Sequence, residues 1–76
     1  MNTLPISLFS REQLNRHASI GGYVVVDHDG RATICELQGW GQRARVQFPS
    51  RNIRSLPLHA VTGIIDPVYT TAVDVK

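Results

Sequence analysis

Apolar and polar residues alternate along most of the chain between residues 23 and 65. Alternation with a period of two is typical of β-strands that bury one face. Clusters of glycine, proline, aspartate and asparagine interrupt the alternation at short intervals, as they do where turns join strands. The pattern therefore predicts five short strands, at residues 23–26, 31–38, 43–48, 53–58 and 61–65.

A helix is predicted before the first of these strands. Ser10 and Gln13 have the spacing of a capping box, in which each side chain satisfies a backbone N–H group of the other residue. The helix is expected to run over residues 11–18 and to end at the glycine pair Gly21–Gly22. Together the elements predict a mostly β fold: a short N-terminal helix followed by a five-stranded, strongly bent antiparallel sheet.

The chain of 76 residues is long enough for one small domain. We expect an extended arm over residues 1–8, the folded domain over residues 9–67, and a tail over residues 68–76 whose strand-like composition has no evident partner. Cys35 is the one cysteine, so an internal disulfide is excluded, and we expect it to be a small core residue. The three histidines are far apart in the sequence, so no metal or cofactor is expected.

The sequence also predicts where the protein is found. No apolar run approaches the roughly 18 residues of a membrane span, and the first residues lack the basic region of a signal peptide. We therefore expect a cytoplasmic protein without membrane contact. A chain this short, with neither disulfide nor metal, often gains stability by oligomerising.

Charge is unevenly distributed within a protein whose net charge is only +2. Between Leu37 and Ile65 the chain has no acidic residue. The arginines of that stretch are Arg43, Arg45, Arg51 and Arg54. A stretch of one sign concentrates positive potential, and the usual partner of such a surface is a polyanion, most often nucleic acid. The alternative is that these arginines form only the solvated face of a sheet.

Several short segments, in this order, resemble the Sm-like (LSm) family, and within it most closely the bacterial Hfq type. The helix contains a Leu-Asn pair at residues 14–15, and the first hairpin ends in Gly30. Trp40 stands where that family has an aromatic residue in the bend between its second and third strands. Residues 59–65, His-Ala-Val-Thr-Gly-Ile-Ile, are similar to the family segment in which His-Ala precedes a β-branched run. The resemblance covers residues 9–67.

The resemblance implies a homo-oligomeric ring, in which the fourth predicted strand of one subunit pairs with the fifth strand of the next. Both strands are expected to lie at open edges of the sheet. Head-to-tail pairing of such edges closes into a ring, here of about five to seven subunits. Loops repeated around one pore then bind single-stranded RNA, which implies a post-transcriptional or RNA-chaperone role and no enzymatic activity.

The implied RNA-binding residues form two groups. Around the pore, Gln42 is expected to bond base edges, Arg43 to stack on a base or bind a phosphate, and His59 to donate to a phosphate or a ribose hydroxyl. The residues expected at the basic rim are Arg16, His17, Arg51 and Arg54. Three of these assignments have a plainer alternative: His59 can bond a neighbouring carbonyl, and Arg51 and Arg54 can serve solubility alone.

Two other functions are compatible with the same elements. The first is an SH3-like barrel that binds a protein partner, as small phage and plasmid proteins often do. The second is a reductase whose active site is a symmetric pore, because Gly39-Trp40 is loosely similar to the small plasmid-borne dihydrofolate reductases. The Val-Gln-Ile-Tyr sequence that carries their chemistry is absent, and residues 46–48 do not replace it. No general acid, nucleophile or metal set is recognisable either, so we do not expect an enzyme.

Overall fold

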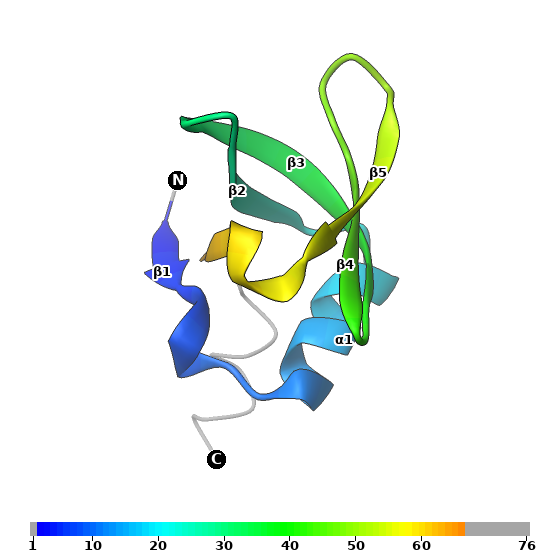
Figure 1. Cartoon of the computed structure of the whole chain (residues 1–76). Helices are drawn as coiled ribbons and strands as arrows, with labels where there is room; N and C mark the ends of the chain where they lie inside the picture. The colour runs from blue at the N-terminus through cyan, green and yellow to red at the C-terminus, as the bar shows by residue number, and fades with distance from the viewer. Residues whose placement is uncertain (1, 67–76) are drawn as a thin grey trace.

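The computed structural model describes residues 2–66, so the expected tail over residues 68–76 lies outside the described residues. Within that range the chain is mostly β with one α-helix, as the sequence predicts (Figure 1). All five predicted strands are present, and a further short strand precedes them. The elements in chain order are β1 (Thr3–Pro5), η1 (Ile6–Leu8), α1 (Arg11–Ser19), β2 (Tyr23–His28), β3 (Arg31–Trp40), β4 (Arg43–Gln47), β5 (Ile53–Pro57), η2 (Leu58–Ala60) and β6 (Val61–Ile65).

The helix α1 begins as the capping box predicts. The backbone N–H of Gln13 donates to Ser10 Oγ at 3.2 Å, and the backbone N–H of Ser10 donates to Gln13 Oε1 at 2.8 Å. Both bonds satisfy backbone groups that a helix start otherwise leaves without a partner. The helix ends at Ser19, one residue later than predicted, and packs against β3 with Leu14 and His17 buried.

The strands form one antiparallel open sheet in the order β1-β6-β2-β3-β4-β5. The predicted hairpin between β2 and β3 is confirmed, because Asp29 and Gly30 both have positive φ, 54° and 75°, as the tightest hairpin turns require. The strand β3 extends two residues beyond its predicted end at residue 38. Its register against β4 shifts between Leu37 and Gly39.

Alternate positions of the central strands supply the core. Val24 on β2, Leu37 on β3 and Val46 on β4 are fully buried, which confirms the predicted alternation. His17 joins them from α1: it is only 1% exposed, and its Nε2 lies 2.8 Å from the carbonyl oxygen of Tyr23. The expectation of a basic helix rim that includes His17 is therefore wrong, because this imidazole belongs to the core.

The N-terminal segment is part of the sheet. Within the expected arm over residues 1–8, β1 pairs with the outer side of β6. The paired residues are Thr3↔Ile65, Leu4↔Ile64 and Pro5↔Gly63. The expectation that β6 is an open edge is therefore wrong, whereas β5 does lie at an edge. Three residues that include a proline have no alternation to reveal a strand, so the local sequence does not mark this pairing.

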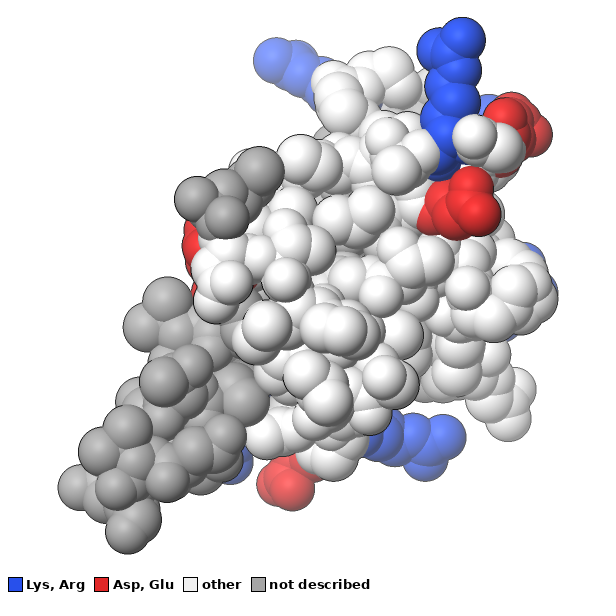
Figure 2. Space-filling model, turned by 90° about the vertical axis from the view of Figure 1, so that its left-hand side faces the viewer, with Lys and Arg blue, Asp and Glu red and all other residues white. Residues whose placement is uncertain are grey.

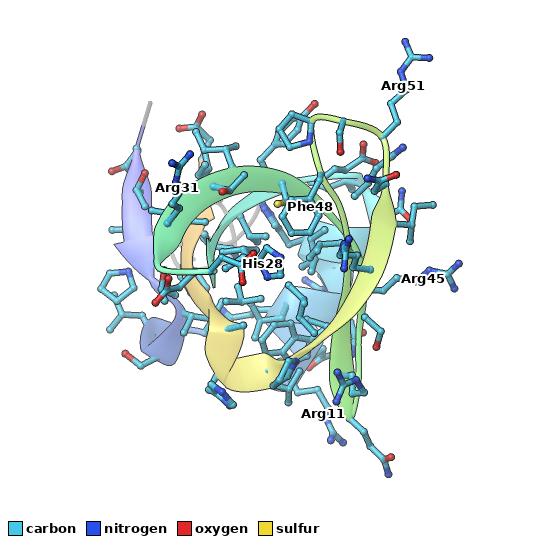
Figure 3. The ribbon with its side chains drawn as sticks, turned by 45° about the horizontal axis from the view of Figure 1, so that its top comes forward. Arg11, His28, Arg31, Arg45, Phe48 and Arg51 are labelled. Carbon is cyan, nitrogen blue, oxygen red and sulfur yellow. The ribbon has the colours of Figure 1, made fainter. Side chains whose placement is uncertain are left out.

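Different groups of residues surround the two ends of β3. Near its start, His28 at the end of β2 and Phe48 after β4 stack edge to face, with ring centroids 5.3 Å apart. Figure 3 shows both rings in the middle of this end of the sheet. At the other end of β3 lie the β3–β4 turn and η2, which we call the η2 end. Two rings thus stack at one end of the sheet, and three of the candidate site residues lie at the other.

Candidate functional site

Three of the six residues predicted to bind RNA come together at the η2 end. The strand β4 begins at Arg43, directly after Gln42, and β5 ends opposite it because Arg43 pairs with Pro57. His59 follows in η2. Gln42, Arg43 and His59 are all exposed. Antiparallel pairing of β4 with β5 therefore brings together residues that are distant in the sequence.

A cavity of about 610 Å³, which we call the η2 cavity, opens at the same end. Its apolar lining includes Phe9, Trp40 and Leu58, each half-buried, and its lining also includes the exposed Arg11 and His59. Among the described residues that line it, none is acidic. An apolar floor beside a guanidinium suits a planar anionic ligand, because its ring can stack while its charge stays near the guanidinium.

Arg43 has a fixed orientation at the η2 end. Its Nε–H donates to Ser55 Oγ at 3.0 Å, and its Nη2–H donates to the carbonyl oxygen of Ser55 at 3.0 Å. A guanidinium carries more N–H groups than these two bonds use, so others remain for an anion. Because the side chain is already restrained, less conformational entropy is lost when an anion binds.

The other three predicted residues lie in different regions. Arg51 occupies the β4–β5 turn with a φ of 75°, at the opposite end of β4 from the η2 end, and Figure 3 shows its side chain pointing away from the sheet. Arg54 on β5 and Arg45 on β4 line a shallow cavity of about 300 Å³. Arg16 is exposed on α1. The predicted residues are therefore spread over several surfaces: His59 lines the η2 cavity, and Arg51 lines a second cavity of about 510 Å³.

Sequence reasoning did not include Phe9 and Arg11 in the site. Phe9 precedes the helix cap and Arg11 is the first residue of α1, so both look like parts of a helix start when only neighbours are considered. The η2 cavity draws its lining from the start of α1, the end of β3 and η2. The approach of these three segments is a long-range feature, and no local pattern marks it.

The described residues offer little for covalent or metal chemistry. Within residues 2–66, no group of three or more histidine, cysteine, aspartate or glutamate side chains is placed to hold a metal ion. Cys35 is buried, and burial raises the pKa of its thiol above the ordinary value of 9.0. A buried, protonated thiol is a poor nucleophile at neutral pH. In the same range, no helix has both the length and the apolar character needed to cross a bilayer.

Comparisons of the chain with protein-family models, with curated proteins and with solved structures gave no match. The resemblance to the Sm-like family therefore stays an expectation from the sequence.

Proposed function

We propose that the protein binds single-stranded RNA at the η2 end, as a cytoplasmic small-barrel protein of the Sm-like kind. The observation that carries the proposal is the combination of the η2 cavity, lined by aromatic residues and Arg11, and the restrained guanidinium of Arg43. Bases of single strands are free to enter such a cavity, whereas bases of a duplex are stacked and paired. A post-transcriptional or RNA-chaperone role follows from binding of this kind.

The residues of the η2 end suit different parts of a nucleotide. Trp40 offers a ring on which a base can stack, and such stacking contributes about 1–3 kcal/mol per base. Arg11 and Arg43 attract phosphates. His59 can donate to a phosphate or accept from a ribose 2′-hydroxyl, which favours RNA over DNA, and the amide of Gln42 can bond base edges.

The ring of subunits is a separate part of the proposal. Without β1, the order β6-β2-β3-β4-β5 places the fourth and fifth predicted strands at opposite edges, as the Sm-like resemblance implies. In the single chain, however, β1 covers the outer edge of β6, so a ring closed by β5 and β6 needs β1 to move. Binding at the η2 end does not need a ring, although repeated copies would add avidity.

The proposal is tested by fluorescence polarisation of a labelled single-stranded RNA. The double variant Arg43→Ala/His59→Ala is expected to bind at least about tenfold more weakly than the wild type, which corresponds to about 1.4 kcal/mol. The affinity of the wild type should also fall steeply with salt, and the slope should be shallower for the variant by about one phosphate contact.

Arg31→Ala is the matched control for this experiment. Arg31 is exposed, like Arg43, but it lies beside the β2–β3 turn, at the opposite end of β3 from the η2 end. We expect Arg31→Ala to leave the affinity nearly unchanged. Equal losses for Arg31→Ala and the double variant would indicate a diffuse charge effect, and an unchanged affinity of the double variant would refute binding at the η2 end.

A second candidate function is protein binding, as in SH3-like barrels, on the outer face of the sheet. Tyr23 and Ile34 are 52% and 43% exposed, and they line a cavity of about 510 Å³ together with Phe48. Aromatic side chains of this kind are enriched in protein interfaces. A protein interaction that is lost with Tyr23→Ala and kept with Arg43→Ala would favour this candidate.

A further inference from the structure

The strand β1 and its partner β6 form an uncharged edge of the sheet. Residues 2–10 and residues 61–65 contain no charged residue. The face that carries β1 is largely free of charged side chains in Figure 2, which shows them mainly towards its upper and lower margins. Edge strands of natural proteins usually carry charges or other features that discourage pairing with foreign strands. The outer edge of β6 would lack such protection if β1 were absent.

Gly63 makes room for β1 on β6. A β-carbon at Gly63 would lie 3.1 Å from Cγ2 of Thr3 and 3.2 Å from the carbonyl oxygen of Leu4. Both distances are tighter than ordinary van der Waals contact, so a side chain there would push β1 outwards. On the β2 side, the same atom would lie 3.9 Å from Cβ of Val25, which is an ordinary contact. The absence of a side chain at Gly63 therefore mainly allows β1 to approach β6 closely.

Few interactions hold β1 in place. Thr3 and Pro5 are exposed, and Pro5 has no N–H group to donate to the sheet. Beyond the strand pairs, Asn2 N–H donates to Asp66 Oδ1 at 2.8 Å, and Asp66 N–H donates to the carbonyl oxygen of Asn2 at 2.7 Å. Both of these residues are exposed. Segments with exposed hydrogen bonds and little buried apolar surface are the ones that open locally.

The strand β5 is the other incomplete edge. Among the described strands it pairs only with β4, so the backbone N–H and C=O groups on its far side have no partner in the sheet. Its length of five residues equals that of β6. The two edges are therefore matched in length, although β1 covers one of them.

We propose that β1 is an exchangeable strand that masks the edge of β6, and that its release allows β5 of a second copy of this chain to pair there. Charge favours this pairing: two β5 strands would bring two copies of Arg54 close together, whereas β5 beside β6 sets a basic strand against an uncharged one. The contact is head-to-tail, because β5 of one copy meets β6 of the next. Repeated contacts of this kind close into a ring if the rotation that relates neighbouring copies is a whole fraction of a turn. This proposal rests on the ring of the proposed function, which it makes conditional on the release of β1, and it does not depend on RNA binding.

The test compares the full chain with two variants that weaken β1 from opposite sides. Leu4→Asp places a charge at the half-buried position of β1, and Gly63→Ala inserts a methyl group beneath the strand. Ser7→Asp is the matched control, because it adds the same charge to an exposed residue of η1. Size-exclusion chromatography with light scattering gives the mass, and hydrogen exchange followed by mass spectrometry reports the protection of β1, β5 and β6.

The wild type and Ser7→Asp are expected to have the mass of one chain, 8.4 kDa. Leu4→Asp and Gly63→Ala are expected to form a discrete species of several chains, in which amides of β5 gain at least about tenfold protection while those of β6 stay protected. A single-chain mass for both variants while β1 exchanges freely would overturn the proposal. A larger mass without new protection of β5 would overturn it as well.

The wild type provides a measurement that does not depend on how well the variants fold. Amides of β1 are expected to exchange faster than those of β2 and β3, because β1 opens without unfolding of the core. Equal protection of β1 and the central strands would overturn the proposal. A wild type that is already multimeric with β1 protected would also overturn it, since β1 would then not compete with assembly.

Discussion

The imidazole of His17 lies directly against the backbone of Gly22: a β-carbon at Gly22 would come within 2.3 Å of both Cε1 and Nε2 of the ring. The same Nε2 lies 2.8 Å from the carbonyl oxygen of Tyr23, so the ring cannot turn away without losing that hydrogen bond. The connection between α1 and β2 therefore requires a residue without a side chain at position 22.

Gly22→Ala is expected to lower the free energy of unfolding by about 1–3 kcal/mol, the usual cost of overpacking a filled site. Gly41→Ala is the control, since a β-carbon at Gly41 would meet nothing within 4 Å, and its effect should stay within about 0.5 kcal/mol. Urea denaturation measures both. Equal stabilities of the two variants would mean that His17 does not occupy this position in solution.

Trp40 is expected to report RNA binding directly. It is the one tryptophan of the chain, and it lines the η2 cavity. A base that stacks on the indole should quench its emission, so tryptophan fluorescence should fall during an RNA titration with the same midpoint as polarisation. His59→Ala should move both midpoints together. Emission that stays constant while polarisation shows binding would place the RNA elsewhere on the protein.

Ser55→Ala tests whether the orientation of Arg43 contributes to binding. The substitution removes the Oγ acceptor but keeps the carbonyl acceptor and every cation. We expect RNA affinity to fall about two- to fivefold, which corresponds to about 0.5–1 kcal/mol, because Arg43 then loses more conformational freedom on binding. Ser50→Ala, an exposed change in the β4–β5 turn, serves as control. Identical affinities of the two variants would show that the restraint on Arg43 has no effect.

Cys35 should make stability depend on alkaline pH. Burial raises the pKa of its thiol above 9.0, so the folded chain keeps the proton at pH values where the unfolded chain releases it. This contribution to stability is complete below pH 9.0 and is lost as the pH rises towards the folded-state pKa. Cys35→Ala lacks the group, and urea denaturation curves of the two proteins should diverge above pH 9.0. Parallel pH profiles would contradict a raised pKa.

Features that depend on neighbouring residues were predictable from the sequence. Ser10 and Gln13 lie within one helical turn, and Asp29 and Gly30 themselves form the hairpin turn, so their types determine the local backbone. The predictions for the start of α1 and for the β2–β3 hairpin are accordingly confirmed. The alternation along β2, β3 and β4 also sufficed to identify their buried faces, because a period of two leaves only one face for the core.

Features that depend on long-range contacts were not predictable. The pairing of β1 with β6 requires Gly63 to admit Thr3, and neither residue reveals the other. The burial of His17 was not predictable because histidine is a polar residue. It follows from the way the chain turns from α1 into β2, which brings the imidazole against Gly22. The Sm-like resemblance predicted that Gln42 and His59 lie in one region, and the structure places both at the η2 end. It did not predict that Phe9 and Arg11 line the η2 cavity. The RNA-binding roles of all these residues stay predictions.

His28 and Phe48 have a consequence for how a long RNA would meet the protein. Their rings stack near the β2–β3 turn, whereas Gln42, Arg43 and His59 are exposed at the η2 end. Under the proposed function, an RNA would therefore lie across the outside of one end of the molecule. Such binding would not require a free 5′ or 3′ terminus.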